Sequence, residues 1–156
     1  MALQARRSLN VWHKHTKSLD DRNAVDELTK SWNQEYTSGK PFYDKRGLAG
    51  GANESLDLYG GLVDGYSNYL NYTVLHEIAI KNLSESQNLT IGNAANPVNI
   101  FGAGATTIDI PPGDIFCLSN HDTGWTVTAG SADEIKVALA AGDAAYYEIW
   151  LLGSTA

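Results

Sequence analysis

Cysteine, methionine and proline are scarce in this chain, which has one Cys, one Met and four Pro among 156 residues. Because Cys117 is the only cysteine, no disulfide can form within the chain, and a disulfide-stapled secreted scaffold is excluded. Cys117 lies in the apolar run Ile115–Leu118, where we expect a buried, inert thiol rather than a reactive one. These features favour a protein made in a reducing cytoplasm.

Long apolar segments are also missing. No run approaches the ~18 apolar residues that a membrane-spanning helix needs, and the apolar stretches have the length of strands. The basic residues Arg6 and Arg7 have no apolar core behind them, so we expect no signal peptide. With a hydrophobic fraction of 43%, the sequence is typical of a folded globular chain that has no membrane partner.

Motifs for catalysis and cofactor binding are lacking as well. The chain has no Gly-x-Ser-x-Gly elbow, and the glycine-rich stretch 102–106 leads into an expected strand, whereas phosphate binding needs a helix N-terminus. His13 and His15 supply two imidazoles, but no nearby residues complete a metal site. We therefore expect a protein that is not an enzyme and has no catalytic residues, metal, cofactor or nucleic-acid partner.

Basic residues are nearly absent after residue 50. Residues 1–50 carry nine Lys or Arg and six Asp or Glu, a net charge of +3. Residues 51–156 carry two basic and twelve acidic residues, a net charge of −10. A basic segment on an acidic body indicates that the segment reaches an acidic surface, either on a partner or on a neighbouring subunit, unless both parts are simply solvated.

The first third of the chain is polar and short of periodicity. We expect residues 1–53 to form an extended, mostly irregular arm with a short helix over 21–32, where Ala24, Leu28 and Trp32 have helical spacing. Glycine and proline between 34 and 51 predict irregular chain there. Aromatic and basic side chains of the arm are then the expected partner-binding residues: Arg6, Arg7, Trp12, Lys14, Lys17, Trp32, Phe42 and Tyr43.

From residue 54 onward the pattern becomes that of β-structure. Short strands recur about every ten residues with turn-rich separators, which predicts an all-β, antiparallel sandwich or jelly-roll-like body over 54–156. In the longest expected strand, 72–83, the residues Tyr72, Val74, His76, Ile78 and Ile80 share one mostly apolar face.

Four aromatic residues in the C-terminal half, Trp125, Tyr146, Tyr147 and Trp150, could form a sugar-binding platform. Trp125 lies between a turn and a strand, where it could equally plug the end of the core. The second alternative is favoured, but a carbohydrate-binding adhesin module stays open.

The order of several segments in 54–153 resembles that of small structural proteins of tailed bacteriophages and prophages. These segments are Leu56-Asp57-Leu58-Tyr59-Gly60-Gly61-Leu62, Leu89-Thr90-Ile91-Gly92-Asn93-Ala94, Ile110-Pro111-Pro112-Gly113-Asp114-Ile115-Phe116, residues 124–133 and Tyr147-Glu148-Ile149-Trp150-Leu151-Leu152-Gly153. The resemblance implies a virion protein, most closely a capsid decoration (cement) protein that binds the major capsid protein.

The same resemblance implies a homotrimer on the capsid surface, made in the host cytoplasm. A tail or neck protein is the structural alternative. Decoration proteins bridge neighbouring capsid subunits, so they need a rigid body and an anchor, and binding by many copies offsets weak individual contacts. Residues 1–50 match no pattern of this group, so the resemblance does not say how the protein attaches.

Overall fold

The computed structural model describes residues 5–18, 23–36, 38–102 and 106–155, and it divides the chain into two compact units, 1–38 and 39–156. The division falls between Ser38 and Gly39, whereas the sequence predicts an arm that runs to residue 53. The described residues are all β and contain no helix.

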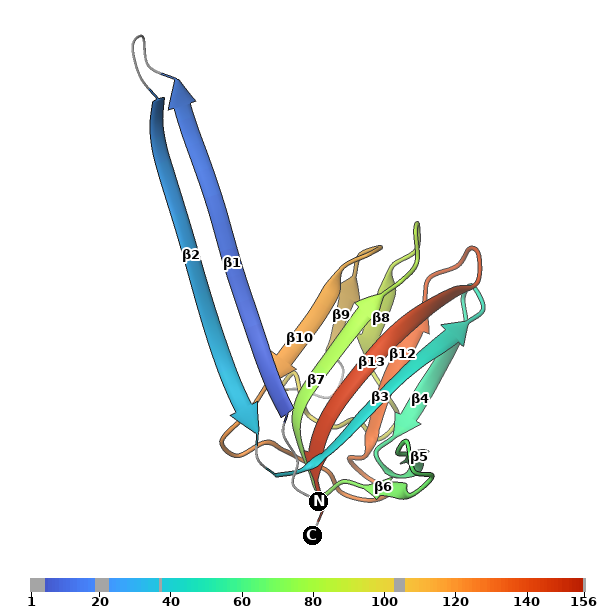
Figure 1. Cartoon of the computed structure of the whole chain (residues 1–156). Coiled ribbons are helices and arrows are strands. Elements are labelled where there is room, and N and C mark those ends of the chain that lie inside the picture. Colours follow the sequence, from blue (N-terminus) through green and yellow to red (C-terminus); the bar gives the residue numbers. More distant parts are fainter. Residues whose placement is uncertain (1–4, 19–22, 37, 103–105, 156) are drawn as a thin grey trace. The chain divides into compact units, whose positions relative to one another are not determined.

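The first unit is a β-hairpin with two long strands, β1 (Ala5–Ser18) and β2 (Asn23–Tyr36). They pair antiparallel in one unbroken register, from Ala5 opposite Tyr36 to Ser18 opposite Asn23 (Figure 1). The expected irregular arm is therefore wrong over these two strands, and the expected helix over 21–32 is wrong over its described part, 23–32. Leu28 and Trp32 are four residues apart, and because four is an even number this spacing also places them on one face of a strand.

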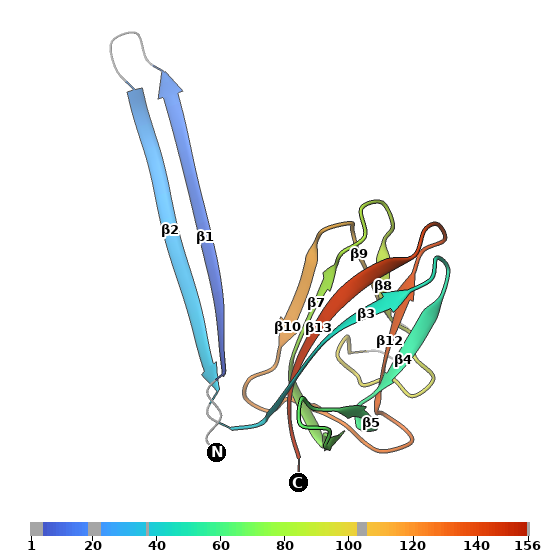
Figure 2. The same cartoon turned by 45° about the vertical axis from the view of Figure 1, so that its right-hand side comes forward.

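The second unit contains two larger antiparallel sheets (Figures 1 and 2). In the five-stranded sheet the order is β10-β7-β13-β3, with β11 also paired to β7; its strands are β3 (Lys40–Leu48), β7 (Val74–Asn82), β10 (Ile115–Ser119), β11 (Trp125–Thr126) and β13 (Ala145–Ser154). In the four-stranded sheet the order is β4-β12-β8-β9, from β4 (Asn53–Asp57), β8 (Leu89–Gly92), β9 (Thr107–Ile110) and β12 (Glu134–Leu139). A small pair, β5 (Tyr59–Val63) and β6 (Tyr69–Asn71), completes the unit.

One hydrophobic core joins the two larger sheets. Alternate residues of β12, namely Ile135, Val137 and Leu139, are buried, and they belong to the same cluster as Ile80 of β7 and Ile149 of β13. Period-two alternation is what the sequence predicts for strands with one covered face, and here each sheet covers the other. The expected irregular stretch 34–51 is wrong over Lys40–Leu48, because β3 lies at the edge of the five-stranded sheet, where Pro41 is tolerated.

The predicted face of the longest strand is confirmed only in part. Ile78 and Ile80 are buried in the core, but the register between β7 and β13 shifts, so that Leu152 pairs with Glu77 and Gly153 with Leu75. This β-bulge adds one residue, so Leu75 rather than its neighbours reaches the core.

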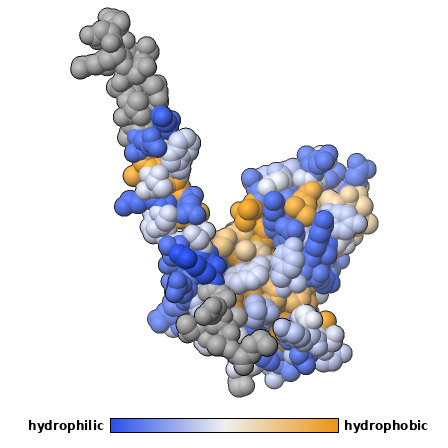
Figure 3. All heavy atoms as spheres, viewed as in Figure 1, coloured by the Kyte–Doolittle hydropathy of each residue, from blue (hydrophilic) through white to orange (hydrophobic). Residues whose placement is uncertain are grey.

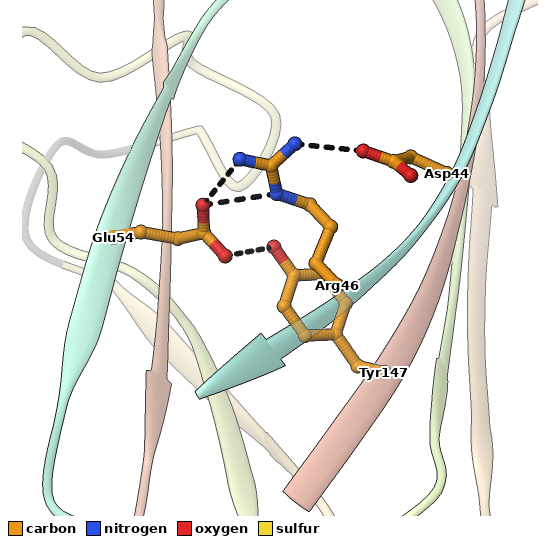
Figure 4. A network of polar contacts seen from close by, with 4 residues as sticks. All are labelled: Asp44, Arg46, Glu54 and Tyr147. Carbon is orange, nitrogen blue, oxygen red and sulfur yellow. Dashed lines mark hydrogen bonds and ion pairs between the residues drawn. The ribbon is translucent and has the colours of Figure 1, made fainter. Parts of the chain in front are cut away.

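A charged cluster ties the two sheets together at one end of β3 (Figure 4). The Arg46 guanidinium donates from Nε and Nη2 to Oε2 of Glu54, at 2.9 and 2.7 Å, and from Nη1 to Asp44 at 2.8 Å. The buried Tyr147 hydroxyl donates to the other Glu54 oxygen at 2.9 Å. Because Arg46 and Tyr147 belong to one sheet and Glu54 to the other, this carboxylate crosslinks the layers. The Glu54 hydrogen bond raises the pKa of Arg46, which stays charged.

Replacing Glu54 with Ala tests this crosslink. The substitution removes three hydrogen bonds and leaves the Tyr147 hydroxyl buried without this acceptor, so we expect the free energy of unfolding to fall by about 2–4 kcal/mol. Asp44→Ala is the control, because that carboxylate contacts the same guanidinium but is more exposed, and its loss should cost less than about 1 kcal/mol. Urea unfolding followed by circular dichroism compares them, and equal losses would contradict the assignment.

Tyr72 fixes the start of β3. Its ring is fully buried against Gly153, where an added Cβ would lie 2.6 Å from the Tyr72 Cδ1, so only glycine fits. The Tyr72 hydroxyl donates to the Lys40 carbonyl oxygen at 2.8 Å. Burial raises the pKa of Tyr72 above its ordinary value of 10.0, and burial followed by the Glu54 charge does the same for Tyr147.

These two tyrosines predict a loss of stability in alkali. Above about pH 10 the unfolded chain releases tyrosine protons that the native state keeps, because the native pKa values are higher. The unfolding free energy therefore falls with rising pH, by about 1.4 kcal/mol per pH unit for each tyrosine. We expect Tyr72→Phe to lower the free energy of unfolding by about 1 kcal/mol at pH 7. Above pH 10.5 the unfolding free energy of this variant should fall less steeply with pH than that of the wild type, by about 1.4 kcal/mol per pH unit. Urea titrations at several pH values measure the slopes; identical slopes would contradict this.

Candidate interaction surfaces

The structure spreads the predicted partner-binding residues over both units. Arg6, Arg7, Trp12, Lys14 and Trp32 lie on the hairpin. Lys17 is in β1, and its side chain lies outside the described residues.

Two predicted residues belong instead to β3 of the second unit. Tyr43 is exposed, but Phe42 is buried in the core, so its prediction as a partner-binding residue is wrong. Neighbouring residues of a strand point to opposite faces, and Phe42 is the one that faces the other sheet.

The new boundary also changes the charge distribution. Lys40, Lys45 and Arg46 belong to β3 and hence to the second unit. Residues 1–38 then carry six basic and five acidic residues, a net charge of +1, and residues 39–156 carry a net charge of −8. The hairpin as a whole is therefore nearly neutral, so its partner need not be strongly acidic.

One face of the hairpin is polar and internally hydrogen-bonded. The Ser8 hydroxyl donates to the Asn33 side chain at 2.8 Å, and the Ser31 hydroxyl donates to the Asn10 side chain at 2.6 Å. Further along the same face, the Trp12 indole nitrogen donates to Glu27 at 3.3 Å. We call this the polar face; because its groups bond one another and meet water, it needs no cover.

The opposite face is largely apolar over its middle, where Lys30, opposite Val11, is a charged exception. Leu9 and Trp32 are directly opposite each other, and Val11 and Leu28 extend the patch along the strands; all four are exposed. We call these four residues the apolar face. Figure 3 shows such hydrophobic side chains among hydrophilic ones on the hairpin. Two strands alone cannot bury such a face, and an isolated two-stranded hairpin is marginally stable in water at best.

A second exposed apolar surface lies on the five-stranded sheet, on the side away from the core. Tyr43 and Ile115 are 62% and 65% exposed there, and Cys117, Ala79 and Trp150 follow one another across the sheet beside them. A hollow of about 220 Å³ is lined by residues of this surface. We call it the outer face.

Charged residues cross the outer face in one row. Glu148 lies between Lys81 and Lys45 on the neighbouring strands, and its carboxylate accepts a hydrogen bond from the Tyr43 hydroxyl at 3.1 Å. That bond raises the pKa of Tyr43 above its usual value. The row of alternating charge next to apolar side chains is suited to contact with another protein.

Cys117 is exposed, so the expected buried thiol is wrong. In β10 the neighbouring Phe116 is half-buried and packs against the core, with its ring edge-on to Phe101 at a centroid distance of 5.9 Å. Alternation then turns Cys117 to the outer face, with its Sγ 3.9 Å from Oε1 of Glu77. The apolar run 115–118 suggested a strand covered on both sides, whereas only one side is covered.

The four aromatic residues considered for sugar binding do not form one platform. Trp125 packs against the core, as expected for a residue that plugs its end, and Tyr147 is buried in the core. Tyr146 and Trp150 lie on the outer side, where the Lys45 ammonium stands 5.1 Å from the centre of the Tyr146 ring.

Two other kinds of site are absent from the described ranges. No cluster of three or more His, Cys, Asp or Glu suited to a metal ion is found there, and the side chains of His13 and His15 lie outside them. In the same part of the chain, no helix has the length and apolar character needed to span a membrane. No protein-family model and no curated protein matches the chain.

The exposure of Cys117 predicts ready reaction in the native state. We expect a thiol reagent such as Ellman's reagent to modify one thiol per chain without denaturant, at a rate within about tenfold of the unfolded chain. Cys117→Ser should show no reaction. If the wild-type thiol reacts only after denaturation, the outer face is covered and the assignment is wrong.

Proposed function

We propose that this protein is a structural component of a tailed-bacteriophage virion, a capsid decoration protein that binds the major capsid protein. The observation that carries the proposal is the pair of exposed apolar surfaces, one on the hairpin and one on a body with an extensive core. Large apolar side chains left in water mark surfaces that bind other proteins. The resemblance of residues 54–153 to phage structural proteins supplies the identity of the assembly.

In this proposal the body is a β-sandwich of the jelly-roll kind, and the protein forms homotrimers on the capsid surface. The outer face, with Tyr43, Ile115 and Trp150, is the surface that meets the shell. The crosslink through Glu54 suits the body to this role, since a rigid surface loses little conformational entropy on binding.

The outer face also favours a protein partner over a sugar. Its charged row, Lys81, Glu148 and Lys45, offers ion pairs at the rim of the apolar surface, and such a mixture is typical of protein interfaces. Carbohydrate binding has less support, because two of the four aromatic residues that would form its platform lie in or against the core.

Binding to shells tests the proposal. The full chain should co-sediment with expanded capsids made from the major capsid protein of the same genome. Tyr43→Asp and Ile115→Asp should each weaken binding about thirtyfold or more, since each places a charge in an apolar contact. Tyr66→Asp is the matched control, because Tyr66 is 77% exposed but belongs to the turn between β5 and β6.

Protection of Cys117 supplies an independent measurement. The thiol should react freely in the unbound protein and slowly on the shell, because it lies on the outer face. If the wild-type chain binds tails but not capsids, the decoration proposal is wrong. If it binds capsids with Cys117 unprotected and with both Asp variants unaffected, the outer face is not the contact.

A further inference from the structure

The hairpin carries an exposed apolar face, and its two strands differ in net charge. Strand β1 contains four basic residues, Arg6, Arg7, Lys14 and Lys17, and no acidic residue. Strand β2 contains three acidic residues and one basic residue, Asp26, Glu27, Glu35 and Lys30. The two edges of one hairpin therefore carry net charges of +4 and −2.

Residues of opposite charge on the two strands also occupy paired positions in the register. In the register, Arg6 is opposite Glu35 near one end of the hairpin, and Lys14 is opposite Glu27 toward the other. The Lys14 ammonium is 4.0 Å from the Glu27 carboxylate, and both side chains are about half exposed. Such exposed pairs can be shared with a neighbour, because they are held loosely and retain contact with water.

We propose that hairpins of several copies of this chain associate side by side around a rotation axis that runs along their length. Each copy turns its apolar face toward the axis and its polar face outward. The β1 edge of each copy then lies beside the β2 edge of the next, at the same height, so Arg6 meets Glu35 and Lys14 meets Glu27 of the neighbouring copy.

Symmetry and charge together select this arrangement. Rotation about an axis parallel to the hairpins brings β1 beside β2 of the neighbour, which pairs basic with acidic edges. A two-fold axis perpendicular to the plane of the hairpin could instead place β1 of one copy beside β1 of the next. The basic residues of the two β1 strands would then repel one another. A closed ring of hairpins also removes the exposed strand edges, which otherwise invite uncontrolled pairing.

The choice of inward face follows from the hydrogen bonds. Asn10, Asn33, Ser8 and Ser31 already bond one another on the polar face, so burying them would gain little. Burying the four residues of the apolar face removes apolar surface from solvent. Lys30 lies on the same face opposite Val11, and its alkyl stem can pack beside these residues while its ammonium keeps contact with water. This inference adds to the proposed function the surface through which copies meet, and its test uses no capsid, so either can fail without the other.

The first test compares two tryptophans of one hairpin. Trp12 and Trp32 are 61% and 56% exposed, but Trp12 is on the polar face and Trp32 is on the apolar face. Each is replaced by Thr, which favours strands. By analytical ultracentrifugation of the full chain, Trp32→Thr should raise the dissociation constant of the oligomer about thirtyfold or more, and Trp12→Thr by less than about threefold.

The second test uses a charge-swapped chain, Arg6→Glu and Lys14→Glu with Glu27→Lys and Glu35→Lys. The paired positions 6 with 35 and 14 with 27 keep opposite charges, both within one hairpin and between identical copies. The charge-swapped chain alone should therefore form oligomers like the wild type. Mixed with wild-type chain, it places acidic edges beside acidic edges, and native mass spectrometry should find few mixed oligomers.

Three results would overturn the inference. They are a wild-type chain that stays monomeric at tens of micromolar, equal effects of the two tryptophan substitutions, or statistical mixing of swapped and wild-type chains. Near-ultraviolet circular dichroism of the body checks that each variant remains folded.

Discussion

A β-sheet has two faces, and an apolar face must be covered by something other than water if the sheet is to be stable. The second unit meets this constraint by packing its five-stranded and four-stranded sheets around one core, with Ile80 and Ile149 from one sheet and Val137 from the other. The hairpin has only two strands, so it has no second layer of its own, and Leu9, Val11, Leu28 and Trp32 remain exposed. The difference between a covered and an uncovered apolar face separates the stable part of this protein from the part that we propose to be completed by other copies.

Polar interactions follow the same division. In the body, the fully buried Asn82 is satisfied internally, because its side-chain amide donates to the carbonyl oxygens of Gln87 and Ile110 at 2.8 and 2.9 Å. The Arg46–Glu54 pair likewise joins the two sheets where solvent reaches them only in part. On the hairpin, by contrast, the ion pair of Lys14 and Glu27 is exposed, and its charges remain available to a neighbour. Stability within the body and association through the hairpin thus rest on different groups.

The sequence predicts the antiparallel β-structure of the body, because its strands alternate and its turns are rich in glycine and proline. It predicts β3 poorly, since Pro41 and Gly47 are normally breakers, and only the pairing with Leu152 and Tyr146 of β13 makes an edge strand there. The β-bulge opposite Leu152 could not be foreseen either, because it depends on which residues of β7 and β13 meet.

The interaction surfaces were predictable only in part. Leu28 and Trp32 have a spacing that fits both a helix and a strand, and the matching alternation of Leu9 and Val11 in β1 is the signal that favours a hairpin. The apolar run around Cys117 predicts burial, because the sequence does not show that β10 is covered on one side only. The charge division at residue 50 does not coincide with the structural boundary, because Lys40, Lys45 and Arg46 belong to the body.

Hydrogen exchange of the full chain at two protein concentrations tests the central claim most directly. If copies associate through the hairpins, amides of β1 and β2 that point away from the partner strand exchange slowly at high concentration, and this protection is lost on dilution below the dissociation constant. Amides of the body should be unaffected. Fast exchange of the hairpin amides at every concentration, or protection that dilution does not change, would contradict the account.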